Sequence, residues 1–431
     1  MRRAFAQPRF KRLFGGLTAS MLGDSMMLLV LSMWVKTLTG SNSLAGLTFF
    51  FMVVPALFAP LLGVWIDRVR RKPLLVWGNL ASAAVVAPLV LVRDASDVWL
   101  VWAVAFGYGI SFIVLPAALN GLLKELLPED LLVEANASLQ TTKQGFRLFG
   151  PLLGAALFAG IGGWLVALID VATFLVAAAV IATIPVQEHR PDPDPTPLRS
   201  QLTVGLRHLV ADRLLKHLLA GFGLTLLVLG FSEAAIYALL DGFDRPASYA
   251  GVLVSVQGVG AVLGGLVVSR LVKQRGEIAA ATLGLLAMAL GSAGIAAAPT
   301  LTMVLAFIAV LGVSLPFVMV SYMTLLQRRT PQRVMGRVST AVEVVLTTPQ
   351  AISLALGSLL VVLLDWRAIF AIKAVAILIA AGYVAVRLRD QLHRRPVPEK
   401  PPARSLAEAT ATGQPTHPSA EIADVPPPGA G

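Results

Sequence analysis

The stretch Gly63-Val-Trp-Ile-Asp67-Arg68-Val-Arg-Arg71-Lys72-Pro-Leu-Leu75 separates two long apolar runs and holds four basic residues close to one acidic residue. A related stretch, Gly265-Leu-Val-Val-Ser269-Arg270-Leu-Val-Lys273-Gln274, follows another apolar run much further along the chain. A Leu-Pro pair also occurs twice, at 115–116 and at 315–316. Both pairs of segments occupy equivalent places in the two halves of the chain. The sequence therefore predicts a repeated architecture, which is typical of membrane transporters.

The composition indicates that most of the chain lies in lipid. Hydrophobic residues make up 56% of it and charged residues 14%, and the mean hydropathy is +0.77. Soluble domains carry about 25% charged residues and do not repeat apolar runs of about 20 residues along nearly the whole chain. The apolar windows predict twelve transmembrane helices, at 15–38, 44–66, 74–92, 98–119, 137–160, 164–184, 214–240, 247–269, 278–297, 301–325, 338–363 and 367–386.

These spans divide the chain into four segments. Residues 1–184 are expected to form an N-terminal six-helix bundle and residues 214–387 a C-terminal one. Residues 185–213 are predicted to be a cytoplasmic linker, because a Pro-Asp-Pro-Asp-Pro-Thr-Pro run favours extended chain. The alternation of apolar and basic residues over 198–217 predicts an amphipathic helix on the inner leaflet. Residues 388–431, rich in Pro, Ala, Thr and acidic side chains, are expected to be a disordered cytoplasmic tail.

The basic residues lie mainly in alternate connections between the spans, which predicts the orientation. The formal net charge is +11, a value that also occurs in nucleic-acid-binding proteins. The positions of the basic residues exclude a nucleic-acid-binding protein here. Lys and Arg gather before the first span and after the second, eighth, tenth and twelfth, where the positive-inside rule expects cytoplasmic loops. We therefore expect both termini in the cytoplasm. The absence of cysteine excludes disulfides and thiolate metal sites.

Several short motifs resemble those of the major facilitator superfamily. The 63–75 stretch is similar to that family's loop signature, Gly-x-x-x-Asp-Arg-x-x-Arg-Lys-x-x-Leu. Leu22-Gly23-Asp24, Ala135-Asn136-Ala137 and Gly150-Pro151-x-x-Gly154 resemble its twelve-span drug-efflux branch, which includes macrolide and enterobactin exporters. The resemblance covers nearly the whole chain up to the tail. It implies an all-α membrane fold of two pseudo-symmetric six-helix bundles, a monomeric state and a bacterial inner-membrane location.

The same resemblance assigns a conformational role to the loop signature. It implies that Gly63, Asp67, Arg68, Arg71 and Lys72 form a cytoplasmic latch, which holds the two halves together in the outward-open state. Gly63 is expected to let the second span approach a neighbouring helix closely. The alternative for the cations is that they only determine topology.

A second group, Gly150, Pro151 and Gly154, resembles the antiporter motif of the family. Ala155 stands where that motif ends in glycine. The resemblance implies exchange of a substrate for an ion, and the departure at Ala155 weakens this inference.

Ionisable residues within the predicted spans are candidates for coupling. A charge at bilayer depth costs at least about 2.5 to 3.5 kcal/mol on insertion scales, so each one needs a partner, a cavity or a function. We predict that one or more of Asp24, Glu233 and Glu343 carries a proton, with Arg147 stabilising the ionised carboxylate. The alternative for Asp24 is a structural hydrogen bond to a neighbouring helix. Two further residues, Asp170 and Lys373, are expected to lie near span ends and to reach the interface.

Helical spacing groups some of these residues with other polar side chains. In the fifth span Gln140, Gln144 and Arg147 follow i, i+4, i+7, and in the first span Ser20 lies one turn from Asp24. In the eleventh span the polar stripe consists of Thr340, Glu343, Thr347 and Gln350. A polar stripe on a spanning helix must face protein or water, so we expect these residues to line a central substrate cavity. Met27 and Tyr322 belong to Met-rich segments that are expected to add an adaptable apolar wall.

These features favour a secondary active transporter over an enzyme. The sequence contains no His-Glu-x-x-His motif, metal cluster or phosphate-binding loop, so we expect no catalytic residue, metal site or cofactor. By resemblance, the protein exports small lipophilic or amphipathic molecules in exchange for protons by alternating access. A proton-coupled importer or a uniporter of a small metabolite is the main alternative. A membrane scaffold is a weaker one, because it does not explain the repeat.

Overall fold

The computed structural model describes residues 2–66, 68–186, 188 and 198–392, which form helices and no strand. The elements of the N-terminal half are α1 (Arg2–Phe5), α2 (Pro8–Thr39), α3 (Asn42–Val53), η1 (Val54–Phe58), α4 (Ala59–Ile66), α5 (Arg71–Val86), η2 (Ala87–Leu91), η3 (Ala95–Asp97), α6 (Val98–Leu126), α7 (Glu129–Gly160) and α8 (Gly163–Ala182). Those of the C-terminal half are α9 (Leu198–Ala211), α10 (Arg213–Asp241), η4 (Ala247–Tyr249), α11 (Ala250–Ala297), α12 (Leu301–Arg329), α13 (Gln332–Leu363), α14 (Trp366–Arg387) and α15 (Arg389–Leu392).

The expected twelve spans are confirmed. Within the described part of the chain, ten helical segments are long and apolar enough to cross a membrane. One of them, running from η4 through α11, contains two spans, because Gly276 interrupts the helix with a φ of 84° that favours glycine. The remaining span is α7, whose N-terminal part is rich in charged and polar residues.

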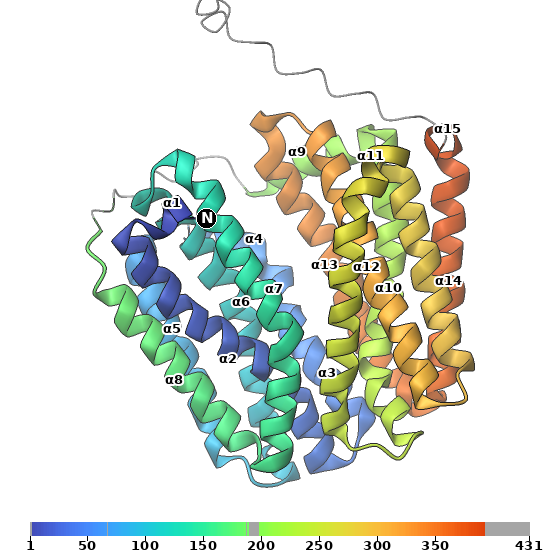
Figure 1. Cartoon of the computed structure of the whole chain (residues 1–431), viewed down its shortest axis with the longest axis horizontal. Coiled ribbons are helices and arrows are strands. Elements are labelled where there is room, and N and C mark those ends of the chain that lie inside the picture. Colours follow the sequence, from blue (N-terminus) through green and yellow to red (C-terminus); the bar gives the residue numbers. More distant parts are fainter. Residues whose placement is uncertain (1, 67, 187, 189–197, 393–431) are drawn as a thin grey trace, which may run out of the picture. The chain divides into compact units, whose positions relative to one another are not determined.

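The two halves repeat the same helix packing (Figure 1). The first span, α2, packs against α7 and α8, which are the fifth and sixth spans. The seventh span, α10, packs against α13 and α14, which are the eleventh and twelfth. The repeat inferred from sequence is therefore also a repeat of helix contacts.

The linker helix differs from its predicted extent. The sequence predicts one amphipathic helix over 198–217, but α9 ends at Ala211 and a new helix begins at Arg213. Asp212 separates the two because its carboxylate accepts hydrogen bonds from the backbone N–H groups of Leu214 and Leu215, at 2.8 and 3.0 Å. Helix α9 packs on α13, where Gly205 lies against Arg337 and Ala341. The Pro-rich part of the linker and the predicted tail beyond residue 392 lie outside the described residues.

Helices α11 and α12 make the most extensive helix pair, and small residues allow their close approach. A Cβ atom on Gly264 would collide with the backbone of Val313, whose carbonyl carbon would lie 3.0 Å away. The adjacent Gly265 is exposed, and a Cβ atom there would meet nothing within 4 Å.

This contrast predicts opposite effects of the same substitution at neighbouring positions. Gly264→Ala should lower the thermal unfolding midpoint, because overpacking costs about 1–3 kcal/mol. Gly265→Ala should leave it unchanged or raise it, since alanine favours a helix over glycine by about 1 kcal/mol. Thermal unfolding of the purified protein measures both. Equal effects of the two substitutions would contradict the close α11–α12 contact.

Candidate functional site

A cavity of ≈ 440 Å³ lies between four helices of the N-terminal half. Helices α2, α5, α6 and α7 contribute its walls. The lining is Leu17, Ser20, Met21, Asp24, Ser25, Leu28, Leu75, Asn79, Ser111, Phe112, Leu115, Pro116, Leu119, Asn120, Asn136, Leu139, Gln140, Lys143 and Arg147. Apolar side chains therefore face a small set of amide, hydroxyl and charged groups, which is the usual composition of a small-molecule site.

Helix α7 contributes the polar wall. Asn136, Gln140, Lys143 and Arg147 recur every three or four residues, so they share one helix face, and all four are exposed. Gln140 and Arg147 were expected in a cavity, whereas Gln144 is exposed but does not line this one. Lys143 is missing from the predicted stripe. Its spacing of i+3 from Gln140 was a usable signal, but the i+4 step led to Gln144 instead.

Asp24 enters the cavity from α2 together with Ser20. Its carboxylate lies within electrostatic range of Lys143 on α7 and of Asp170 on α8. Asp24 lies near Asp170 because α2 and α8 pack closely at this point. Gly23 lies directly against Asp170 and Thr173, and a Cβ atom at Gly23 would overlap both side chains.

Asp170 corrects a prediction from sequence. It was expected to lie near a span end and reach the interface, but its side chain is 0% exposed. The Tyr108 hydroxyl on α6 donates a hydrogen bond to Asp170 Oδ2, while Asp170 Oδ1 has no partner among the described residues. The error arose because α2 and α6 cover this part of α8.

Lys373 corrects a second prediction of the same kind. It was expected to extend to the interface, but its exposed fraction is 2%. It lies on α14, on the side that faces α10. Its Nζ donates a hydrogen bond to Ser232 Oγ at 2.8 Å and lies 5.5 Å from the centre of the Phe370 ring. The charge of Glu233, an exposed side chain on α10, attracts it. Glu233 thus has a cationic neighbour that sequence did not assign to it.

Two of the other predicted cavity residues, Met27 and Tyr322, do not line this cavity. Both are fully buried in the hydrophobic core, where the Tyr322 ring stacks on Phe222 at a centroid distance of 5.6 Å.

The polar stripe predicted on α13 does not line this cavity either. Thr340 donates a hydrogen bond to the carbonyl of Gly336, Glu343 is exposed, and Thr347 and Gln350 are half-buried.

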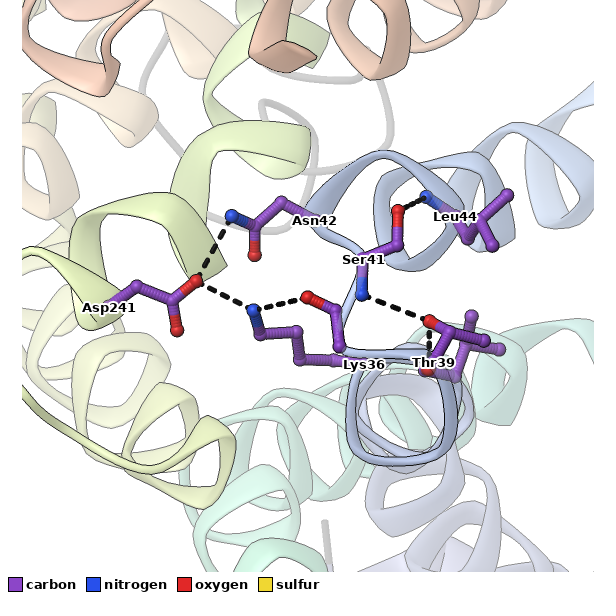
Figure 2. A network of polar contacts seen from close by, with 8 residues as sticks. Lys36, Thr39, Ser41, Asn42, Leu44 and Asp241 are labelled. Atoms are coloured by element: carbon purple, nitrogen blue, oxygen red, sulfur yellow. Dashed lines mark hydrogen bonds and ion pairs between the residues drawn. The ribbon is translucent and has the colours of Figure 1, made fainter. Parts of the chain in front are cut away.

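Side-chain contacts join the two halves along α2 and at the start of α3. Ser32 Oγ and the Tyr237 hydroxyl are 2.5 Å apart. Asp241, the last residue of α10, binds two residues of the N-terminal half (Figure 2). Its Oδ2 accepts from Lys36 Nζ at 2.6 Å and from Asn42 Nδ2 at 3.0 Å. Here the helices of the two halves are joined by a buried hydrogen bond and a partly exposed ion pair.

Comparison with known proteins identifies the family. The sequence profile of the Major Facilitator Superfamily matches residues 13–354. The chain belongs to this superfamily. It is therefore a multi-pass membrane transport protein and not an enzyme.

Relatives within the superfamily are distant. An uncharacterised transporter of the superfamily from Bacillus subtilis, YfiS, is 26% identical over 362 residues, which cover 81% of this chain and 85% of that protein. Macrolide efflux protein A of Streptococcus pyogenes is 24% identical over 179 residues, or 41% of this chain and 44% of that protein.

Solved structures share the fold. The nucleoside transporter NupG superposes with a TM-score of 0.70 at 12% identity, over 89% of this chain and 99% of that chain. A bacterial homologue of the lysosomal transporter Spinster gives a TM-score of 0.66 at 15% identity, over 91% of this chain and 98% of that chain.

The superfamily's loop signature makes contacts within its own half. Asp67 lies outside the described residues, and Arg68 is exposed. Arg71 donates to the carbonyl of Ile66 at 2.6 Å, and Lys72 Nζ to the carbonyl of Ala182 at 2.9 Å. Gly63 differs from expectation, because a Cβ atom there would meet nothing within 4 Å. It supports no close helix approach in this conformation.

The antiporter-like motif of the superfamily lies beside the cavity. Gly150 and Gly154 let α7 contact α2, since Cβ atoms there would collide with Ser25 and Met26. On the other side of α7, Pro151 and Ala155 pack against Gly251 of α11, in the opposite half. Ala155, where the family motif has glycine, is thus a contact between the halves.

The buried tyrosines provide a matched test of the Asp170 site. Tyr108→Phe removes the hydrogen-bond donor of Asp170 and should destabilise the protein by about 1–3 kcal/mol, the cost of an unsatisfied buried polar group. Tyr322→Phe should be neutral or stabilising, because the Tyr322 hydroxyl is buried without a partner among the described residues. Thermal unfolding of both variants checks this. A larger loss for Tyr322→Phe would contradict the assignment.

Proposed function

We propose that this protein is a proton-coupled secondary transporter that exports small lipophilic or amphipathic molecules by alternating access. The observation that carries the proposal is the ≈ 440 Å³ cavity, in which the Asp24 carboxyl lies among apolar and amide side chains. Its volume is within the range of small-molecule sites, about 300–1,000 Å³. An ionisable group at membrane depth is a coupling candidate because its charge is costly there.

The proposed orientation places both termini in the bacterial cytoplasm. The positive-inside rule supports it, through residues such as Arg68, Arg328 and Arg329 in the connections. In this orientation the Lys36–Asp241 contact lies at the outer end of the molecule, as expected of a state closed to the outside. The latch around Asp67 then acts in the opposite state.

Asp24 and Asp170 together are the proposed proton carriers. Two neighbouring carboxylates repel each other, so one proton held between them is a favourable arrangement. Arg147, in the same cavity, is proposed to stabilise the form that has lost the proton. Glu233, which has Lys373 as a counter-charge, and Glu343 on α13 are further candidates.

The export direction is supported by similarity and by the antiporter-like motif. Part of the chain is similar to macrolide efflux protein A, and Gly150 and Gly154 join α7 closely to the helix that carries Asp24. Contact of Ala155 with Gly251 gives the same helix a connection to the opposite half. A change at Asp24 could therefore be transmitted to the contact between the halves.

One observation favours a second candidate, import of substrate together with protons. The cavity holds two cations, Lys143 and Arg147, and one lining carboxylate, Asp24. This excess of positive charge suits a negatively charged substrate. An anion and a proton then bind together more readily than separately, which is the condition for co-transport rather than exchange.

The sign of proton exchange on binding separates the two directions. Purified protein in weak buffer is mixed with lipophilic cations, macrolides, catecholate siderophores or organic anions, and the pH is recorded. Export by exchange predicts proton release, whereas co-transport predicts proton uptake. Either signal should be lost in the variant Asp24→Asn, Asp170→Asn. Bound ligand without any pH change would contradict proton coupling.

Asp94 offers a control carboxylate for this measurement. It lies in the exposed connection before α6, where hydrogen bonds from the Ser96 side chain and backbone N–H hold the pKa of Asp94 below its usual range. Asp94 therefore stays ionised near neutral pH and exchanges no proton. Asp94→Asn should leave the signal unchanged.

The contact at Asp241 should control the population of the outward-open state. Asp241→Asn removes the ion pair with Lys36, and exposed pairs contribute about 0.2–1 kcal/mol, so the ratio of closed to outward-open molecules should fall by up to about fivefold. Spin labels at Ser43→Cys and Arg245→Cys, in a chain without native cysteine, report the distance. Asp130→Asn, which breaks the Arg3–Asp130 pair within one half, is the control. An unchanged distance distribution in Asp241→Asn would contradict the gate.

A further inference from the structure

We propose that the cavity recognises the negatively charged group of an amphipathic molecule through Lys143 and Arg147. The proposal rests on the proposed function only in taking this cavity as the substrate site, and it applies to either direction of transport. It names the substrate class, an organic anion with a small apolar body.

Lys143 and Arg147 are arranged as a pair. They are four residues apart on α7, so their side chains leave the same face one turn apart. Both are exposed and both line the cavity. Within the described part of the chain, neither makes a hydrogen bond or an ion pair, and their positive charges repel each other. Their donors are therefore available to a ligand.

Asp24 does not neutralise this pair. Its carboxylate attracts Lys143 without a hydrogen bond or ion pair between them. The same carboxylate is also repelled by the nearby, buried carboxylate of Asp170. No other acidic residue is among those lining the cavity. One carboxylate against two cations leaves an excess positive charge at membrane depth.

A bound anion would relieve this excess. Two cations at membrane depth are each costly, and their repulsion adds to the cost. A carboxylate, sulfonate or phosphate can accept two parallel hydrogen bonds from the planar guanidinium of Arg147 and a third from the Lys143 ammonium. A cationic ligand would have Asp24 as its sole attractive charge and would face two repulsive ones.

The remaining walls match the apolar part of such a molecule. Helices α2, α5 and α6 contribute the apolar lining residues Leu17, Met21, Leu28, Leu75, Phe112 and Leu119. Met21, which is unbranched and flexible, helps this surface to accommodate apolar bodies of varied shape. Asn120 on α6, with Asn136 and Gln140 on α7, offers amide groups to any further polar atoms of the ligand. The lining thus combines a cationic pair with apolar side chains, the two features that an amphipathic anion requires.

Three probes with the same apolar body test the proposal. 1-Naphthoate, 1-naphthylmethanol and 1-naphthylmethylammonium differ mainly in charge. Their binding to the full chain in nanodiscs of zwitterionic lipid is measured by equilibrium dialysis, with empty nanodiscs subtracted. We expect the carboxylate to bind at least roughly tenfold more tightly than the other two, as for a charge-assisted hydrogen bond.

Variants assign the preference to the two cations. Lys143→Gln and Arg147→Gln should each reduce it by roughly tenfold, the effect of losing one charge-assisted hydrogen bond. Lys143→Arg should retain it, because it keeps the charge. Lys273→Gln, which removes an exposed cation from α11 outside the cavity, should leave it unchanged. Equal affinity for the three probes, or a preference that survives the double variant, would overturn the proposal.

The measurements distinguish a loss of anion binding from misfolding and from a loss of transport. Comparison of the three probes on the unaltered protein decides the question even if a glutamine variant fails to fold, which thermal unfolding reveals. Probe uptake or release by proteoliposomes is recorded independently. Selective anion binding without transport of any probe would refute the proposed function but not the site. Transport without anion preference would refute the site alone.

Discussion

The membrane interior offers no water to solvate a charge, and the structure of this protein depends on that constraint. Backbone polar groups must pair internally, so the described chain is helical. Each ionisable side chain at membrane depth must find a partner or a cavity. Asp170 accepts a hydrogen bond from Tyr108, and Lys373 donates one to Ser232. Asp24, Lys143 and Arg147 share one cavity. The positions of these charges identify the places where helices from different parts of the chain have to meet.

Helix α7 connects the cavity to the rest of the molecule. One face carries the polar side chains that line the cavity, including Gln140 and Arg147. A second region, at Gly150 and Gly154, packs tightly on the helix that bears Asp24, and a third, at Ala155, contacts α11 of the opposite half. A single helix therefore lines the proposed ligand site, packs on the helix that carries Asp24 and contacts the opposite half. Binding and rearrangement of the halves can be coupled through it without a separate relay.

The two halves are similar in helix packing but differ in their polar chemistry. In the N-terminal half, charges open into a cavity that a small molecule can enter. In the C-terminal half, Lys373 is enclosed and forms a direct bond to Ser232, while Glu343 on α13 is exposed. The pseudo-symmetric scaffold thus has a polar cavity in one half and a buried cation, Lys373, in the other. Tyr237, one helical turn from Glu233, makes a contact between the halves with Ser32.

Patterns local in sequence were sufficient for much of the fold and part of the site. Apolar run length predicts the twelve spans, because a helix must cover the bilayer thickness whatever its neighbours are. Helical spacing placed Gln140 and Arg147 on one face, and the cost of an intramembrane charge singled out Asp24. Only the tertiary structure decided that Asp170 and Lys373 are enclosed rather than interfacial, that Lys143 joins Arg147, and that Met27 and Tyr322 belong to the core. The physical reason is that burial depends on which helices cover a position, and that is a property of contacts between segments far apart in sequence.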